Sequence, residues 1–149
     1  MKPLLQQAIE FRVAMDQPLN TLDECVHELQ FDLIKEEMEE FSEAFDHEFS
    51  DLGSLDERRV HLLKELSDLV FVCYQFAAAR GWDLDTAMTR VFESNMSKLV
   101  DGKPLRRDDG KVLKGPNYQP PVLDDLISNL SNKTSSLLVI SSNFVFSNM

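Results

Sequence analysis

Cysteine, tryptophan and glycine are scarce in this chain, whose 149 residues include two cysteines, one tryptophan and five glycines. With only six prolines as well, turn-forming residues are too few for a many-stranded β protein, and the composition excludes fibrous and low-complexity classes. The length suits one compact domain and is too short for two of ordinary size. These absences favour a single helical domain.

The two cysteines, Cys25 and Cys73, lie within apolar helical pattern and form no Cys-x-x-Cys pair. Without a second pair, the chain has neither the ligand set of a zinc site nor a disulfide framework. We expect both thiols to be reduced and buried.

Long apolar runs and excess positive charge are absent as well. No stretch of about eighteen apolar residues is present to span a bilayer, and the first residues lack the apolar segment of a signal peptide. Fifteen Lys and Arg oppose 26 Asp and Glu, a net charge of −11, which disfavours binding to the phosphates of duplex nucleic acid. We therefore expect a cytoplasmic protein with neither a membrane nor a duplex as partner.

Helical periodicity runs through most of the chain, and helix start and stop signals divide it. Two capping-box patterns, Thr21-x-x-Glu24 and Ser54-x-x-Glu57, predict the starts of two long helices, and Gly81 predicts the end of the second. The pattern predicts an all-α fold in which these two helices form an antiparallel hairpin. The expected helices cover residues 3–15, 22–49, 54–80, 83–99 and 122–130.

Two segments after the fourth expected helix depart from this pattern. Glycines and prolines over 102–121 predict a long loop without regular structure. Residues 129–149 are rich in Ser and Asn and end in strand-like apolar stretches, so we treat them as a tail of unknown order. The predicted domain therefore covers residues 1–128.

Acidic residues occupy positions of the long helices at which the periodicity expects apolar ones. In the first, the spacing predicts inward positions near 36 or 37, 40 and 44, and Glu36, Glu37 and Glu40 stand there. In the second, Glu65 and Asp68 are three residues apart among leucines. The spacing of the first helix is set by Leu22, Val26, Leu29 and Leu33.

Carboxylates removed from water without partners are costly and repel one another, so cations must neutralise them. Mg²⁺ prefers oxygen ligands, and acids three or four residues apart on one helix can share an ion with acids of a facing helix. The sequence thus predicts a magnesium site formed by Glu37, Glu40, Glu65 and Asp68. The alternative, a solvated Glu-rich helix face, is disfavoured by the continuing apolar register and the second acidic pair.

Charge is also divided by region. Residues 1–68 hold eighteen acids and six bases, whereas residues 90–114 hold seven bases and four acids. Basic side chains of the second region can hold a polyphosphate while the acids hold its magnesium ions; the alternative is ordinary surface charge.

No histidine, His61 included, adjoins a nucleophile or forms a His-x-x-x-His pair, so we assign none a chemical role. Phe41, Phe45 and Phe49 share a helix face and are expected in the core.

The acids also carry a family resemblance. Glu36-Glu37-x-x-Glu40, then 24 residues, then Glu65-x-x-Asp68 resembles the EExxE…ExxD signature of the all-α NTP pyrophosphohydrolases, the MazG-like group related to dimeric dUTPases and phosphoribosyl-ATP pyrophosphohydrolases. Residues 94–98 and 109–118 resemble the downstream segment of small single-domain members, including phage-encoded ones, for which the location implied is the host cytoplasm. The resemblance covers about residues 4–128.

This resemblance implies a MazG-like four-helix core completed by homo-oligomerisation, as a homodimer or homotetramer. It implies Mg²⁺-dependent hydrolysis of a (deoxy)nucleoside triphosphate between the α and β phosphates, giving monophosphate and pyrophosphate, with Mn²⁺ as a possible substitute. Matching positions would make Glu37, Glu40, Glu65 and Asp68 metal ligands and Glu36 a candidate base or additional ligand. They would make Asn95, Lys98, Lys114 and Tyr118 substrate contacts.

The sequence leaves two other functional hypotheses open. A dUTPase-like or phosphoribosyl-ATP pyrophosphohydrolase activity would use the same metal signature. A catalytically silent helical dimer that binds nucleotide, metal or another protein is disfavoured because the acids are intact.

Overall fold

The computed structural model of the chain describes residues 1–50 and 53–127, so the predicted tail and the end of the last expected helix lie outside the described residues. The chain divides into two compact units, one of residues 1–82 and one that begins at Asp83. The described residues are mainly helical, which confirms the predicted all-α fold.

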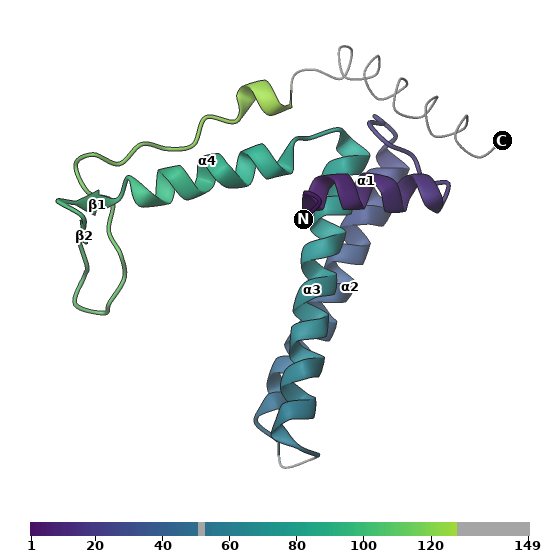
Figure 1. Cartoon of the computed structure of the whole chain (residues 1–149), viewed down its shortest axis with the longest axis horizontal. Coiled ribbons are helices and arrows are strands. Elements are labelled where there is room, and N and C mark those ends of the chain that lie inside the picture. The colour runs from purple at the N-terminus through teal and green to yellow at the C-terminus, as the bar shows by residue number, and fades with distance from the viewer. Residues whose placement is uncertain (51–52, 128–149) are drawn as a thin grey trace. The chain divides into compact units, whose positions relative to one another are not determined.

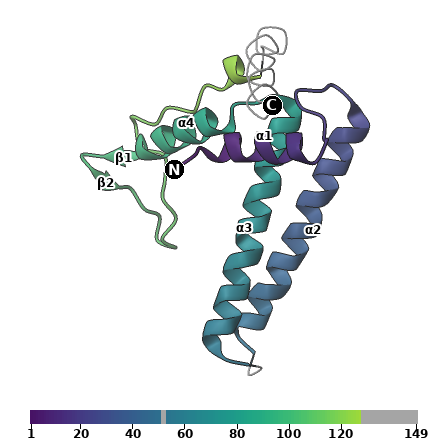
Figure 2. The same ribbon diagram turned by 45° about the vertical axis from the view of Figure 1, so that its right-hand side comes forward.

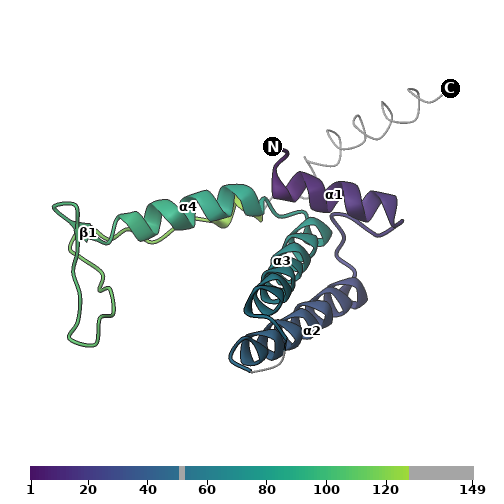
Figure 3. The same cartoon turned by 60° about the horizontal axis from the view of Figure 1, so that its bottom comes forward.

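The first unit consists of three helices: α1 (Leu4–Ala14), α2 (Glu24–Glu48) and α3 (Leu55–Arg80). Helices α2 and α3 lie side by side and antiparallel, as predicted, and α1 packs against α3 (Figure 1). Figure 2 and Figure 3 show the same hairpin from two other directions. The rings of Phe11 and Phe71 join α1 to α3 edge to face, with centroids 5.5 Å apart.

The two predicted capping boxes have different outcomes. Ser54 and Glu57 form the reciprocal box that begins α3, and Gly81 ends this helix in the left-handed conformation, with φ of 71°. The box predicted for Thr21 and Glu24 is wrong. Asp23 caps α2 by accepting a hydrogen bond from the Cys25 amide at 3.0 Å, since an aspartate directly before the first turn is itself a strong N-cap.

The buried seam of α2 differs from the predicted one. His27, Gln30 and Ala44 are its buried residues, whereas Leu22 and Leu29 are 76% and 60% exposed. The seam therefore follows positions 27, 30, 37 and 44, so the predicted inward positions 37 and 44 lie on it, whereas 22, 29 and 40 do not. A register inferred from apolar residues alone fails here because polar side chains occupy the buried positions.

Arg12 anchors the connection between α1 and α2. Its side chain is only 1% exposed, and its Nε and Nη2 atoms donate to the Pro18 carbonyl at 2.9 and 2.8 Å. Burial lowers the pKa of this guanidinium. The two bonds satisfy a backbone carbonyl that follows the helix end.

Both helices of the hairpin carry exposed apolar side chains. Phe31, Met38 and Phe45 of α2 follow one another at intervals of seven and are 54%, 49% and 48% exposed. On α3, the exposed apolar residues Leu63, Leu66 and Val70 are 63%, 41% and 41% exposed. We call these six residues the apolar flank. Phe45 and Phe49 were predicted to lie in the core. This is wrong for the single chain, in which they are 48% and 74% exposed.

Both cysteines are free, as expected, but their predicted burial is wrong for Cys25, which is exposed. Cys73 is half-buried, and burial raises the pKa of its thiol. Within the described residues, no helix has both the length and the apolar character needed to cross a membrane.

The second unit begins with α4 (Leu84–Met96), capped by Asp83. Strands β1 (Leu99–Val100) and β2 (Lys103–Pro104) then form an antiparallel hairpin, and η1 (Asp124–Leu126) is a single 3₁₀ turn. The prediction that residues 102–121 lack regular structure is therefore wrong at β2, and the helix predicted over 122–130 is a 3₁₀ turn within its described part. Asp101 and Gly102, with φ of 50° and 73°, make the two-residue turn, and an Asp-Gly pair is a strong hairpin signal.

Candidate metal and substrate site

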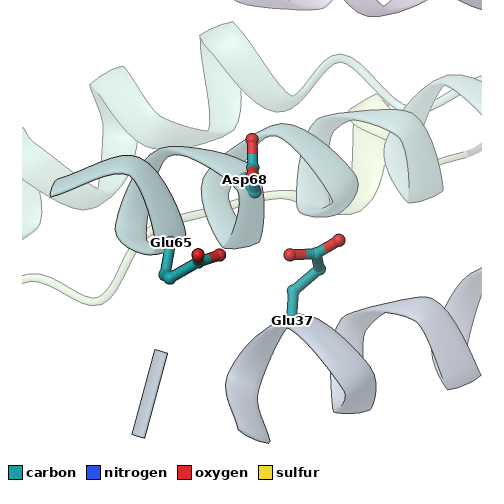
Figure 4. Close-up of side chains that lie close together, drawn as sticks. All are labelled: Glu37, Glu65 and Asp68. Atoms are coloured by element: carbon teal, nitrogen blue, oxygen red, sulfur yellow. The ribbon is translucent and has the colours of Figure 1, made fainter. Parts of the chain in front are cut away.

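Three of the predicted metal ligands converge in the helical hairpin. Glu37 of α2 points toward Glu65 and Asp68 of α3 (Figure 4), and one carboxylate oxygen from each lies within 4.8 Å of the others. Glu65 and Asp68 share a helix face because they are three residues apart. Glu37 reaches them because position 37 belongs to the seam of α2.

The environment of these carboxylates suits a divalent cation. Glu65 is only 3% exposed, and Oε2 of Glu37 is buried without a hydrogen-bond partner. Burial raises the pKa of Glu37, and the negative charges of Glu40 and then Asp68 raise it further. A cation with oxygen ligands would supply the partner that this buried oxygen lacks, so the residues present fit Mg²⁺.

Glu36 and Glu40 are not part of this group. Both are exposed on α2, so the expectation that Glu40 points inward is wrong in the single chain. Its charge nevertheless reaches the group, since Glu40 is the charged neighbour that most raises the pKa of Glu37. Glu36 and Glu40 are one turn apart and share an exposed face of α2.

Two cationic or titratable side chains contact the acids although the sequence analysis gave them no role. Lys64 Nζ lies 2.9 Å from Asp68 Oδ2 and 3.0 Å from Glu65 Oε2, and His61 Nδ1 lies 3.1 Å from Glu65 Oε1. Hydrogen bonds to Asp68 and then to Glu65 raise the pKa of Lys64. The i, i+4 spacings of Lys64 to Asp68 and of His61 to Glu65 were the signal that could have found them.

The four predicted substrate contacts lie in the second unit and form two pairs. Lys98 Nζ donates to Asn95 Oδ1 at 2.7 Å, at the end of α4. Lys114 Nζ lies over the ring of Tyr118, 4.4 Å from its centroid, in a cation–π contact. Lys98 is thus held by Asn95 and Lys114 by Tyr118, so each lysine contacts another of the predicted substrate residues.

Tight backbone packing brings the two segments together. Gly115 is buried, and a Cβ there would lie 2.7 Å from Val100 Cγ2 and 3.0 Å from the Lys98 carbonyl oxygen, so only glycine fits without a shift. The Gln119 amide donates to Ser97 Oγ at 2.9 Å, which fastens the loop to α4. The predicted substrate residues are therefore neighbours in the fold although nineteen positions separate Asn95 from Lys114.

The model of the MazG nucleotide pyrophosphohydrolase domain matches residues 26–106, which is more than half of the chain. The chain belongs to the MazG family. This membership supports nucleotide pyrophosphohydrolase activity in general and confirms the resemblance inferred from the acids. A search of curated proteins found no match.

The MazG match covers part of the candidate site. It contains the five acids predicted for the site together with Asn95 and Lys98, whereas Lys114 and Tyr118 lie beyond its end. The matched residues also fall inside the predicted domain of residues 1–128, whose limits stay a prediction.

Proposed function

We propose that this chain is a Mg²⁺-dependent pyrophosphohydrolase that cleaves a (deoxy)nucleoside triphosphate between the α and β phosphates. The products are the monophosphate and pyrophosphate, and we expect Mn²⁺ to substitute for Mg²⁺. The observation that carries this proposal is the convergence of Glu37, Glu65 and Asp68 around a buried, unpartnered carboxylate oxygen. That convergence lies within the part of the chain that matches the MazG domain.

In this proposal Glu37, Glu65 and Asp68 hold the ion, and Glu40 adds a fourth carboxylate from the next turn of α2. When bound, Mg²⁺ lowers the pKa of water and offsets charge that develops on phosphoryl oxygens. Glu36 accepts the proton of the attacking water. The water oxygen bonds to phosphorus as the bridging P–O bond between the α and β phosphates breaks.

The paired cations of the second unit are proposed to hold the phosphates. Lys98 and Lys114 would exchange part of their contacts with Asn95 and Tyr118 for charge-assisted bonds to phosphate oxygens. Asn95 and Tyr118 would then contact the substrate directly. Because both cations are already oriented, they lose less conformational freedom on binding than free lysines would.

We also propose that the working form is a homodimer or homotetramer. The apolar flank exposes aromatic and aliphatic side chains on both helices of the hairpin, and large exposed apolar side chains are typical of a protein interface. A second copy with the same flank would complete the helical core by a two-fold contact.

A panel of canonical and modified nucleoside triphosphates tests the activity. The protein is incubated with Mg²⁺, Mn²⁺ or excess chelator, and monophosphate, pyrophosphate and orthophosphate are quantified. We expect equimolar monophosphate and pyrophosphate with either metal and none with chelator. Preference for dUTP or phosphoribosyl-ATP would place the chain with those activities instead. Release of orthophosphate, or no hydrolysis of any substrate, would contradict the proposal.

A further inference from the structure

We propose that Lys64 is a built-in counter-cation of the acidic group, which holds Glu65 and Asp68 in the metal-free protein and is displaced when a divalent cation binds. The inference rests on the proposed metal site. Lys64 lies outside the family signature, and in this proposal it controls how tightly the metal is held.

The contacts of Lys64 are unusual for a helix. Its contact with Asp68 Oδ2 at 2.9 Å is the ordinary i, i+4 pair, but Lys64 Nζ also lies 3.1 and 3.0 Å from both oxygens of Glu65, its immediate neighbour. Side chains at i and i+1 of a helix do not face each other. The lysine must therefore fold back over its own helix, which places the ammonium between two carboxylates.

These contacts involve carboxylates that the metal needs, and because Lys64 contacts both oxygens of Glu65, whichever of the two binds the metal already faces the ammonium. Glu65 and Asp68 are two of the three acids whose oxygens converge, and Lys64 contacts both. A magnesium ion binds oxygen at about 2.1 Å and repels an ammonium group beside the same ligands. Both cations cannot keep these oxygens at once, so the ammonium must move when the metal arrives.

Lys64 also has space to move. Its side chain is 58% exposed, whereas that of Glu65 is 4% exposed. The Glu65 carboxylate is thus fixed by the fold, and Lys64 is the more exposed partner in its contacts with Glu65 and with Asp68, whose side chain is 42% exposed. Displacement costs the two ion pairs, and this cost lowers the apparent affinity for the metal.

Removal of the ammonium should have two effects of opposite sign. The metal-free protein loses stability, because Glu37, Glu65 and Asp68 then repel one another without compensation. Metal binding becomes tighter, because no internal cation has to be displaced. A lysine that merely packs against the helix would change stability alone.

The test compares the full chain with Lys64→Met and Lys64→Gln. Calorimetric titration gives the Kd for Mg²⁺, and thermal unfolding in chelator gives the metal-free Tm. We expect the Kd for Mg²⁺ to fall by about threefold to tenfold, consistent with two partly exposed ion pairs, and the metal-free Tm to fall as well. Lys64→Arg keeps the charge and should restore both values.

Lys35→Met is the matched control. Lys35 forms an i, i+3 ion pair with Asp32 on α2 and is 56% exposed, but it does not contact the acidic group. This variant should leave the Kd for Mg²⁺ unchanged.

The outcomes separate the inference from the proposed function. Wild-type protein that binds Mg²⁺, with an unchanged or weaker affinity in Lys64→Met and in Lys64→Gln, would overturn the role of Lys64 and leave the metal site standing. A raised KM for nucleotide with an unchanged Kd for Mg²⁺ would overturn it too, by making Lys64 a phosphate contact. Wild-type protein that binds no Mg²⁺ would overturn the proposed site together with the inference.

Discussion

The helical hairpin and the segment of residues 98–118, here called the basic arm, place their charges by different means. In the hairpin, helix spacing puts Glu65 and Asp68 on one face and brings Glu37 against them. In the basic arm, which lies in the second unit, a tight turn and the close approach of Gly115 to the Lys98 carbonyl bring together the two backbone segments that carry the cations.

The charges also differ in their exposure and in the partners that hold them. Glu65 is almost fully buried, while Lys114 lies exposed over an aromatic ring. A buried acid without a cation is costly, whereas an exposed lysine is stable without a ligand. The hairpin should therefore respond to its ligand in stability as well as activity, and the basic arm in activity alone.

The largest effect should come from the acids. Asp68→Asn and Glu40→Gln should each reduce turnover by at least about 100-fold. Each change removes a proposed metal ligand, which should cost more activity than removing a residue that only supports a ligand. The metal-free Tm should hold or rise as repulsion is relieved. Steady-state kinetics and unfolding in chelator measure both. The control is Asp46→Asn, which changes an exposed acid of α2. Wild-type turnover in Asp68→Asn and Glu40→Gln would show that these two residues are not part of the site.

The second prediction concerns the apolar flank. Met38→Glu places a charge among apolar side chains that a second copy would cover, which should weaken assembly by about tenfold to 100-fold. Light scattering over a range of concentrations measures this. The control Glu43→Gln changes an exposed residue of α2 outside the flank. A stable, active monomer in the wild type would contradict the proposed oligomer.

The basic arm should show the next largest effect, without a change in stability. Lys98→Ala and Lys114→Ala should each raise KM or lower kcat/KM by about tenfold, as expected for loss of a charge-assisted phosphate contact. Circular dichroism should stay unchanged. Lys103→Ala, an exposed lysine of β2, is the control. If both variants keep wild-type kinetics, the arm does not bind substrate.

A backbone change in the arm should act on the same lysines indirectly. Gly115→Ala adds a Cβ within 3.0 Å of the Lys98 carbonyl, so the two segments must separate. We expect a several-fold rise in KM and an unchanged Kd for Mg²⁺. Gly110→Ala, where a Cβ meets nothing within 4 Å, controls for the loss of a glycine, although its φ of 86° adds local strain. Equal kinetics in the two variants would contradict the packing argument.

The smallest effect is expected from acid pH at the start of α3. Hydrogen bonds from the backbone amide and then the hydroxyl of Ser54 lower the pKa of Glu57. Its stabilising contribution is therefore present above the unfolded pKa of about 4.3 and is lost as the pH falls through the folded value. Ser54→Ala should lower Tm modestly at pH 7 and less at pH 3. Ser42→Ala, whose hydroxyl bonds Met38 within α2, should show no such difference.

The hairpin and most of its acids could be predicted from the sequence because helix spacing is local. Glu65 and Asp68 stand three apart among leucines, and this alone placed them on the inner face of α3. The register of α2 could not be read in the same way. Apolar Leu29 is exposed while polar Gln30 is buried, so the inward position fell to Glu37 and not to Glu40.

The structure of the basic arm was harder to predict from the sequence because it depends on contacts between residues that are far apart in the chain. The Asp101-Gly102 turn does have a local signal, because an Asp-Gly pair favours a two-residue hairpin turn. The approach of Gly115 to Lys98 has none, since seventeen positions separate the two residues. The pairing of Lys64 with Asp68 was visible as spacing, but spacing alone does not distinguish a surface ion pair from one at the edge of a metal site.

The buried Arg12 has a consequence for mutational scanning of this chain. Its guanidinium makes two bonds to the Pro18 carbonyl, and a lysine offers no such fork in the same space. In a selection for activity, almost every substitution at Arg12 should score as poorly as one at Asp68, although Arg12 is not among the proposed site residues. Measuring cellular abundance beside activity would separate the two, because Arg12 variants should be lost from the cell while Asp68→Asn accumulates.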